Sequence, residues 1–415
     1  MLSNNKIKIG IFVETFPVVS ETFIVNKILY LFKMGYDVRI FCLKESVQWK
    51  FFPDLIKEIP DVRERVRIGL SVDSLSDYWI ALNRLVSEIV LHPLSTLKFL
   101  AYNLFQSNNK FLTPVEKVFQ RFNFNGVNLD ILSIEFDTLG YKVVDLKSLL
   151  KCKIFINTVG VAQATNTYQK NPKILTYLND YSDMFRFASR FLENNSFKLG
   201  FNKGIKNKVI YCGANPFFDI ENTANLNKPK HKKFKITSVA RLAWSKGYEF
   251  ALEAVALAQK SGLKIQYTII GDGPYKDAIY YAAEQLGLIK NNTVIFKGAL
   301  SLKEIRKELG NSNMFLQTSV IEGFGISVLE AQLMGLPVVV TNVGGLIESV
   351  VNQKTGLIAQ KRDAEDIADK IIYLYKNKEK SSQMGRNGKQ SVRDNFTLKM
   401  EMESLAKSYL ELLKN

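Results

Sequence analysis

The chain has 415 residues, a formal net charge of +16 and a sequence pI near 9.4. Its length suggests two or three domains, and its 47% hydrophobic and 23% charged residues are typical of a globular protein. No apolar run approaches the ~18 residues that a membrane span needs, and the N-terminus lacks the apolar core and cleavage site of a signal peptide. We therefore expect a cytoplasmic protein, whose only contact with a membrane would be peripheral.

The basic excess is spread over both halves of the chain rather than gathered in a tail. Polyphosphate ligands and the anionic inner face of a membrane both fit such a charge. We expect no nucleic-acid partner, because the sequence has no zinc-finger spacing and no aromatic RNA-binding signature. Cys42, Cys152 and Cys212 lie far apart in apolar runs, which predicts buried thiols in a reducing compartment and no metal or redox motif.

The chain begins with a βαβ pattern. Residues 6–13 predict a strand, Ser20 is placed to cap a helix over 21–34 that stops at Gly35, and residues 36–43 predict a second strand. This pattern predicts that the two strands are parallel neighbours joined by a right-handed crossover. The first turn has no G-x-G-x-x-G sequence, which argues against a dinucleotide cofactor.

Residues 50–125 depart from this alternation and carry helical periodicity. One interpretation is a set of helices packed on the sheet and on each other. The other is an aromatic, lysine-bearing amphipathic surface that rests on a bilayer or grips a lipid-linked substrate. Thr113, Pro114 and Glu116 predict a capping-box helix start within this region.

Regular alternation of strand and helix returns after residue 130. This pattern predicts doubly wound parallel sheets, and the polar, lysine-rich stretch 222–233 reads as an interdomain linker. The predicted strands are 131–136, 153–157, 209–212, 234–239, 264–270, 293–296, 314–318 and 338–341, and the predicted helices are 139–150, about 181–193, 248–259, 276–286, 303–309, one from the loop at 319–325 to Gly335, 363–377 and 397–413.

Five unusual loops each follow one of the strands of the second half, at 240–247, 271–274, 297–298, 319–325 and 342–345. Loops after the carboxyl ends of parallel strands line one crevice, where ligands bind. Their glycines let backbone amides approach an anion, and Arg241 and Lys246 supply charge-assisted hydrogen bonds. Glu322 lies in one loop and Glu330 in the helix after it, so the set predicts a diphosphate site with a carboxylate for ribose hydroxyls.

Each piece also has a purely structural interpretation. Gly271-x-Gly273-Pro274 is by itself an ordinary turn, and Arg241 alone is more often a surface ion pair. Glu322 alone could simply be an anion favourably placed before a helix. The convergence of five loops outweighs these separate interpretations.

In order and spacing, these residues resemble the donor half of retaining glycosyltransferases of family 4. The resemblance rests on Arg241-Leu242, Lys246-Gly247, Gly271-x-Gly273-Pro274, Glu322-Gly323-Phe324-Gly325, Glu330-Ala331, Gly335-x-Pro337-Val338 and Gly344-Gly345 with Glu348, and it is dense over about residues 234–395. Glu322 and Glu330, with seven residues between them, match the family's E-x7-E element. In the first half, Phe16-Pro17 and residues 20–24 resemble a subgroup that builds bacterial surface polysaccharides.

The resemblance implies a GT-B architecture of two facing Rossmann-like domains, with a final helix that crosses back to the first domain. The implied limits are an acceptor-binding domain over 1–218, with a helical insertion at about 50–125, a nucleotide-sugar domain over 219–396 and the final helix within 397–415. It also implies a nucleotide-sugar donor, retention of configuration and no cofactor or metal, and the chain has no Asp-x-Asp motif. Carried over by position, the catalytic residues are Glu322, Lys246 and Arg241, and the donor-binding residues are Gly271, Gly273, Pro274, Lys297, Gly298, Ser319, Gly323, Phe324, Gly325, Ile326 and Glu330.

The first domain departs from the family pattern. Many members carry His-x-His-Phe where this chain has residues 133–136, and a second histidine where it has Val159-Gly160. Glu135, Asp137 or Glu14 could occupy that space on the acceptor side, although an unremarkable carboxylate at a strand end is the better interpretation of each. A mechanism in which the leaving phosphate accepts the proton depends less on such a base.

These observations predict a glycosyltransferase that moves a hexose-type sugar from a nucleoside diphosphate sugar to a glycan or lipid-linked glycan in bacterial surface polysaccharide synthesis. Two alternatives stay open at this point. One is a catalytically silent GT-B partner subunit, motivated by the missing histidines, and the other is a sugar-nucleotide epimerase of the same architecture.

Overall fold

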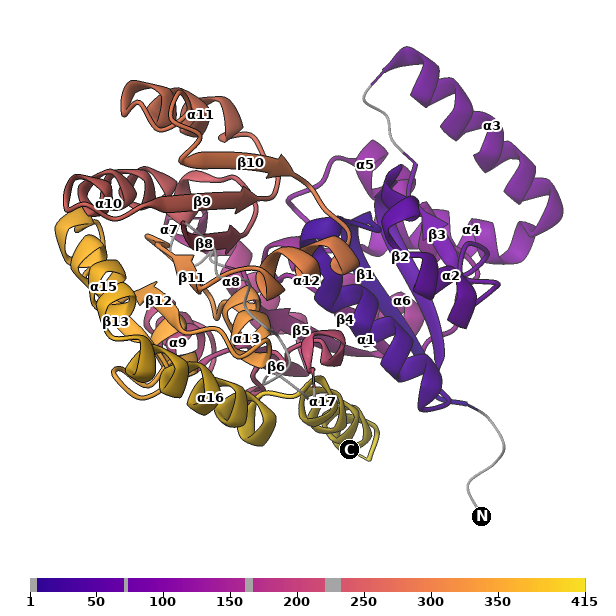
Figure 1. The fold of residues 1–415 in the computed structure, drawn as a ribbon. Helices are drawn as coiled ribbons and strands as arrows, with labels where there is room; N and C mark the ends of the chain where they lie inside the picture. The colour runs from indigo at the N-terminus through magenta and orange to yellow at the C-terminus, as the bar shows by residue number, and fades with distance from the viewer. Residues whose placement is uncertain (1–5, 71–73, 161–166, 221–232, 415) are drawn as a thin grey trace. The chain divides into compact units, whose positions relative to one another are not determined.

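The computed structural model describes residues 6–70, 74–160, 167–220 and 233–414. The chain divides into two compact units, each built on its own sheet (Figure 1). Unit 1 comprises Met1–Ala188, Glu193–Ile210 and Met402–Asn415, and unit 2 comprises Ser189–Leu192 and Tyr211–Glu401. The domain limits drawn from the sequence stay predictions.

Unit 1 contains a seven-stranded parallel sheet in the order β3-β2-β1-β4-β5-β6-β7. Strands covered on both faces read as apolar runs, and β4 and β6 are buried at every position. The strands are β1 (Lys8–Phe16), β2 (Asp37–Glu45), β3 (Val66–Ile68), β4 (Ile131–Ile134), β5 (Lys153–Thr158), β6 (Met184–Phe187) and β7 (Lys206–Val209).

The predicted βαβ start is confirmed, but its helix is not capped as predicted. Ser20 lies inside a 3-10 turn, η1 (Val19–Glu21), and α1 (Thr22–Lys33) begins after Glu21 with no side-chain cap. Tertiary packing of the apolar stripe, including Ile24 and Ile28, therefore stabilises α1 in place of a cap.

The region predicted to be helical is largely helical. It contains η2 (Gln48–Phe51), α2 (Pro53–Glu58), α3 (Leu75–Leu91), α4 (Pro93–Ala101), the π-helical turn η3 (Tyr102–Gln106), α5 (Pro114–Phe119) and η4 (Phe122–Phe124). The capping box of Thr113 and Glu116 is confirmed. The short strand β3, which extends the sheet from within this region, was not predicted.

Two predictions in the second part of unit 1 were wrong. Residues 139–150 form 3-10 turns, η5 (Asp137–Lys142) and η6 (Val144–Leu146), before the short helix α6 (Lys147–Leu150). Buried Gly140 packs so closely that a Cβ would lie 2.5 Å from Leu178 Cδ2. Tertiary packing against this distant residue therefore constrains the backbone here.

The helix predicted at about 181–193 is interrupted by strand β6. It separates α8 (Pro172–Tyr181), which follows α7 (Thr167–Lys170), from α9 (Arg190–Leu199). The charge of Arg186 hides the strand in the sequence, whereas in the structure Arg186 is buried and its Nε donates to the carbonyl of Ile210 at 2.9 Å. The strand predicted at 209–212 overlaps β7 only at Val209, because β7 covers the three residues before it. Its alternating lysines are typical of an edge strand.

Unit 2 contains a six-stranded parallel sheet in the order β10-β9-β8-β11-β12-β13. The five strands predicted here are confirmed within two residues at each end, and β13 was missed. The strands are β8 (Phe234–Val239), β9 (Ile265–Ile270), β10 (Val294–Gly298), β11 (Met314–Gln317), β12 (Val338–Thr341) and β13 (Leu357–Ala359).

The helices of unit 2 confirm the predicted alternation, with two α-helices that were not predicted, the short α14 and the long α16. Helix α16 is mostly polar, so periodicity did not reveal it; it packs by close contact, since a Cβ on Gly385 would lie 2.1 Å from the carbonyl oxygen of Gly335. The helical elements are η8 (Pro216–Phe218), η10 (Trp244–Lys246), α10 (Tyr248–Lys260), α11 (Lys276–Gln285), α12 (Leu302–Gly310), α13 (Ile326–Leu333), α14 (Leu346–Ser349), α15 (Ala364–Lys376) and α16 (Lys378–Asn395).

The final helix α17 (Leu398–Leu413) confirms the helix predicted at 397–413. Its residues from Met402 onward belong to unit 1, where the Tyr409 ring packs on Phe155 and its hydroxyl lies 3.1 Å from Ser133 Oγ. The predicted linker at 222–233 lies outside the described residues except for its last position. Among the described residues, no helix is long and apolar enough to cross a membrane.

The predicted burial of the three cysteines is confirmed. Cys42, Cys152 and Cys212 are all buried, and none of them is in a disulfide. Burial raises the pKa of the Cys42 and Cys152 thiols to about 12, so both are uncharged at neutral pH.

Candidate active site

The predicted donor loops meet at the carboxyl-terminal edge of the unit 2 sheet. Strands β8 and β11 are neighbours, and the loops that follow them are hydrogen-bonded to each other. The amide of Val320 donates to the carbonyl of Ser245 at 2.8 Å, and Thr318 Oγ1 donates to the carbonyl of Gly247 at 2.8 Å. Adjacent parallel strands thus bring Lys246 and Glu322 together across 76 positions of sequence.

Lys246 and Glu322 form the central ion pair of the site. Lys246 Nζ lies 2.5 Å from Glu322 Oε2, and the two side chains are 22% and 12% exposed. The same oxygen accepts hydrogen bonds from Gln317 Nε2 at 2.8 Å and from Ser319 Oγ at 3.1 Å. Three donors therefore hold one carboxylate oxygen, and the described residues supply none for Oε1, which stays available as an acceptor.

Gln317 is a site residue that sequence reasoning missed. It is the last residue of β11, and its Oε1 accepts from Ser327 Oγ at 3.1 Å while its amide group donates to Glu322. The only signal in the sequence is a polar residue at the end of an apolar strand. Gln317 links the strand, the Glu322 loop and the first turn of α13.

The loop at 322–325 directs the N-terminus of α13 toward the same place. Gly325 precedes the helix with φ +95°, a conformation that favours glycine, and a Cβ there would lie 2.5 Å from Leu346 Cδ2. Phe324 is buried and Ile326 opens the helix. The amides of the first helical turn have no partner within the helix, so this end can bind an anion.

Glu330 lies one turn into α13 and is only 9% exposed. Burial raises the pKa of its carboxyl group from 4.5 to about 8. None of the residues described donates a hydrogen bond to this carboxylate. A buried acceptor without a donor is costly unless a ligand satisfies it.

The remaining donor loops are joined to this centre by backbone hydrogen bonds. The amide of Gly271 donates to the carbonyl of Gly298 at 2.9 Å, and the amide of Leu242 donates to the carbonyl of Asp272 at 2.9 Å. A side chain at position 271 would collide with the chain, since a Cβ would lie 1.9 Å from the carbonyl oxygen of Ala240. The loops after β8, β9 and β10 thus form one continuous edge.

The residues on this edge differ in their exposure and in the contacts that they make. Arg241 is exposed, and no described residue forms an ion pair with its guanidinium group. Lys297 is partly exposed and lies 3.6 Å from Glu308 of α12. Gly273 and Pro274 belong to the turn before α11, and Gly323 accepts a hydrogen bond from Ser189 Oγ at 2.8 Å.

The three carboxylates predicted for the acceptor side all lie in unit 1. Glu135 is fully buried and lies 2.7 Å from Lys27 Nζ, and Asp137 is fully buried and accepts from the Tyr168 hydroxyl at 2.5 Å. Glu14 is exposed near the end of β1. Only Glu14 is accessible in this structure, and the acceptor-side role of all three stays a prediction.

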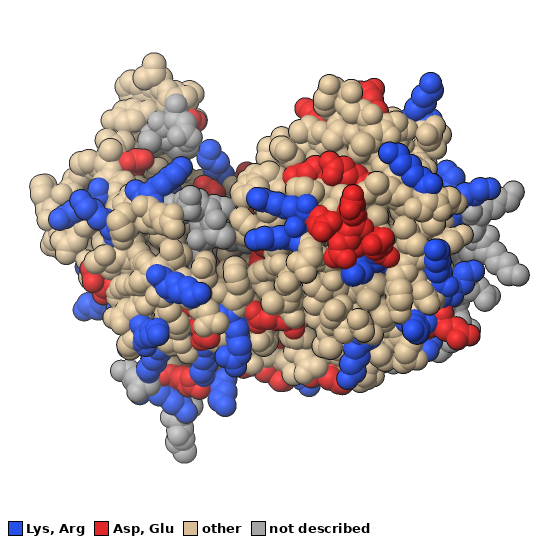
Figure 2. Space-filling view, turned by 90° about the vertical axis from the view of Figure 1, so that its left-hand side faces the viewer, with Lys and Arg blue, Asp and Glu red and all other residues tan. Residues whose placement is uncertain are grey.

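Charge is mixed over the surface seen in Figure 2, where lysine and arginine side chains alternate with aspartate and glutamate. The excess of basic residues is therefore not a single patch on that face. Within the described parts of the chain, no three His, Cys, Asp or Glu side chains are grouped so that they could hold a metal ion.

Comparisons with known proteins show which proteins the chain is similar to. Residues 219–391 match the family described as glycosyl transferases group 1. The chain is 29% identical over 204 residues to the capsular polysaccharide biosynthesis glycosyltransferase CapM of Staphylococcus aureus, which covers 48% of this chain and 52% of that protein. It is 24% identical over 385 residues to the amylovoran biosynthesis glycosyltransferase AmsK of Erwinia amylovora, which covers 88% of this chain and 90% of that protein.

The crystal structure of Anabaena HepE in complex with UDP-glucose shares the fold. Its TM-score is 0.74 at 15% identity, over 97% of this chain and 99% of that one. Two parallel-sheet, Rossmann-like domains are thus common to both proteins. The chain is thus similar to glycosyltransferases, over residues 219–391 in the family match and over most of its length in AmsK, and it has the two-domain GT-B fold.

Proposed function

We propose that the protein is a retaining, metal-independent glycosyltransferase. It moves a hexose-type sugar from a nucleoside diphosphate sugar to a glycan or lipid-linked glycan acceptor during the synthesis of a bacterial surface polysaccharide. The observation that carries the proposal is the Lys246–Glu322 pair, held by Gln317 and Ser319 beside the N-terminus of α13. The relatives named for polysaccharide biosynthesis support the class of product.

In this proposal, cationic groups stabilise the departing diphosphate. Negative charge develops on the leaving oxygen as its bond to the sugar breaks, and donors already fixed in place stabilise that charge without reorganising. Lys246 and Arg241 supply positive charge, and the free amides at the start of α13 supply oriented dipoles. Lys246 is preorganised because Glu322 already fixes its ammonium group.

The two glutamates take different parts of the donor. The Oε1 atom of Glu322 accepts a hydrogen bond from a hydroxyl group of the sugar, while Oε2 stays bound to Lys246. Glu330 accepts hydrogen bonds from the ribose hydroxyls, which would give the buried carboxylate the donors that the described residues do not supply. In this assignment the two glutamates, with seven residues between them, bind two parts of one nucleotide sugar, the transferred sugar and the ribose.

Retention follows in this proposal if the acceptor attacks the face that the leaving group departs from. The leaving phosphate then accepts the proton of the attacking hydroxyl, and no protein base is required. Anomeric configuration of the product, read by NMR, checks retention. Transfer that continues at full rate in EDTA checks metal independence.

The test begins with a panel of nucleotide sugars in a thermal-shift assay. A ligand at 100 times its dissociation constant should add about 2.7 kcal/mol to the free energy of unfolding. Transfer from the stabilising donor is then compared for Lys246→Ala and Lys370→Ala. The control pair, Lys370 with Asp366 at 2.8 Å, is also a partly exposed lysine–carboxylate pair of unit 2.

Lys246→Ala should lower the transfer rate by about 10²- to 10³-fold, as loss of one donor to a developing anion does, and Lys370→Ala should not change it. A folded Lys246→Ala variant with the full rate would contradict the proposal. Conversion of the donor with no acceptor present would instead indicate an epimerase. Failure to bind any nucleotide sugar would indicate a silent partner subunit.

A further inference from the structure

Helices α3 and α4 form a hairpin at the periphery of unit 1, away from its sheet (Figure 1). The inner side of α3 packs against the core: Ala81 is 1% exposed and shares a hydrophobic cluster with Phe99 and Phe119. The ring of Tyr78 meets Phe119 edge-on, with the ring centroids 5.8 Å apart. The hairpin therefore needs no further packing on that side.

The outward side of the same hairpin is also apolar. Leu75, Trp79, Val86 and Val90 recur at helical spacing along one side of α3 and are 83%, 63%, 53% and 74% exposed. Leu97 of α4 and Phe105 of η3 continue this exposure. We call these six residues the hairpin face. Soluble monomers rarely expose contiguous apolar patches larger than a few hundred Å², so such a face indicates a partner.

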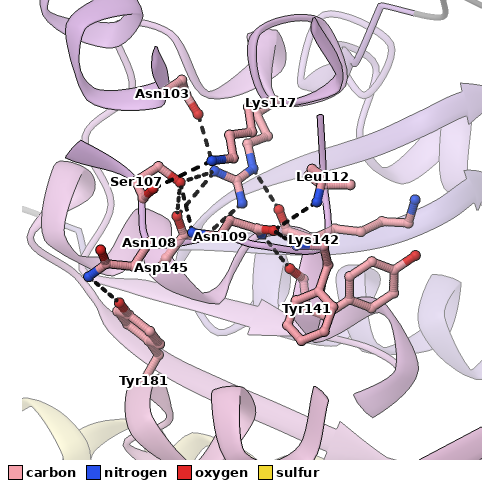
Figure 3. Close-up of polar contacts among 12 residues, drawn as sticks. Asn103, Ser107, Asn108, Asn109, Leu112, Lys117, Tyr141, Lys142, Asp145 and Tyr181 are labelled. Atoms are coloured by element: carbon pink, nitrogen blue, oxygen red, sulfur yellow. Dashed lines mark hydrogen bonds and ion pairs between the residues drawn. The ribbon is translucent and has the colours of Figure 1, made fainter. Parts of the chain in front are cut away.

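A buried network fixes the end of the hairpin in this orientation (Figure 3). Arg121 Nη2 lies 2.7 Å from Asp145 Oδ1, and Arg121 Nη1 donates to Asn103 Oδ1 at 3.1 Å and to Ser107 Oγ at 3.3 Å. Asn103 and Arg121 are both fully buried. Because Asn103 is held inward, Phe105 at 84% exposure is displayed outward by an ordered turn.

The charges around the face have one sign where they are exposed. From residue 75 to residue 112, the exposed charged side chains are those of Arg84, Lys98 and Lys110. Arg84 lies across α3 from the hairpin face, on the side of half-buried Asp77 and Glu88, so the exposed charges on the segment that continues the face are Lys98 and Lys110. The chain as a whole carries +16. A second copy of the protein would set like charges against each other, whereas an anionic surface complements them.

We propose that the hairpin face docks on a bilayer that contains anionic phospholipids. The six apolar side chains enter the boundary between headgroups and acyl chains, and Lys98 and Lys110 meet lipid phosphates. The helices lie in the plane of the interface, as amphipathic helices with one basic margin do. This proposal goes beyond the transfer reaction and does not depend on it.

Flotation of the full chain with vesicles tests the proposal. The vesicles contain phosphatidylglycerol and phosphatidylcholine in about equal amounts, or phosphatidylcholine alone. Binding should favour the anionic vesicles, and Trp79→Ser should weaken it by about tenfold, because burial of one large apolar side chain is worth at least that factor. Tyr281→Ser is the matched control, since Tyr281 of unit 2 is 62% exposed against 63% for Trp79.

Trp79 also gives a readout of insertion. Tryptophan emission should shift to shorter wavelength on anionic vesicles, and Trp79→Phe should abolish the shift while flotation is kept. Circular dichroism verifies that each variant folds, which exposed positions should permit.

Three results would overturn the proposal. They are no flotation of the wild type with anionic vesicles, equal flotation of Trp79→Ser and Tyr281→Ser, and an emission shift that survives Trp79→Phe. A concentration-dependent dimer in sedimentation that Trp79→Ser abolishes would also overturn it, because the face would then bind a second copy.

Discussion

Binding of a nucleoside diphosphate should release a proton from Glu330. Burial raises the pKa of this carboxyl group to about 8, so at pH 7 it is about 90% protonated in the free protein. Ribose hydroxyls that donate to the carboxylate favour its charged form and bring the pKa back toward 4.5. Each bound nucleotide should then release about 0.9 proton at pH 7.

Calorimetric titration with UDP measures this release. The observed enthalpy is compared in buffers of different ionisation enthalpy, and the slope gives the number of protons. UDP has a titrating phosphate of its own, so the Glu330→Gln variant is the reference: it keeps the shape of the side chain and removes its charge. The difference between wild type and variant should be about 0.9 proton at pH 7.

The affinity of the wild type should also rise with pH. Between pH 6 and pH 8 it should increase about 50-fold more than that of Glu330→Gln, because the charged carboxylate is the form that binds. A difference near zero in both proton release and affinity would refute the assignment of Glu330 to the ribose. A folded wild type that binds none of the nucleoside diphosphates whose sugars form the thermal-shift panel would refute the donor site itself.

The same pKa predicts a stability effect in the free protein. Between about pH 4.5 and pH 8 the folded state holds a proton on Glu330 that the unfolded state has lost. The free energy of unfolding should therefore fall as pH rises through this window, and it should fall less in Glu330→Gln. Thermal midpoints of both proteins across the window check the sign, and saturating UDP should reduce the difference.

Two further changes separate donor geometry from general stability. Gly271→Ala forces a Cβ to 1.9 Å from a carbonyl oxygen, so UDP affinity should fall by more than tenfold. Gly262→Ala, which has positive φ but open space around it, should leave affinity unchanged in the same titration. Arg121→Met leaves Asp145 buried without its cation and should lower the free energy of unfolding by about 3–5 kcal/mol in urea denaturation. Arg121→Met combined with Asp145→Asn should recover part of that loss, and an unaltered midpoint in the single variant would contradict the role given to the ion pair.

The site of unit 2 was largely predictable because parallel topology constrains it. Once β8 and β11 are recognised as strands of one parallel sheet, their following loops must emerge at the same edge. That requirement brings Lys246 and Glu322 within reach without any knowledge of their side-chain geometry. Gln317 was not predicted as a site residue because its role depends on hydrogen bonds with Glu322 and Ser327. Hydrophobic periodicity does not identify such contacts.

Unit 1 was less predictable because polar residues are used inside its core. Arg186 lies in the buried strand β6, and Lys27 and Glu135 form a buried ion pair 2.7 Å apart. In a sequence, such residues read as surface positions and break an apolar run. Only tertiary partners, such as the carbonyl of Ile210 for Arg186, make their burial tolerable.

Helix α3 shows why a correct helix prediction did not determine function. Periodicity marks apolar residues on α3 but does not say which of its sides faces the protein, and here both sides are apolar. Ala81, with a small side chain, contacts the core, whereas Trp79 two positions earlier is 63% exposed. A helix that served only to cover the core would gain solubility from charges at positions such as Trp79 and Val86. The outward apolar side therefore indicates a binding partner, and the exposed basic side chain of Lys98 on α4 favours an anionic one.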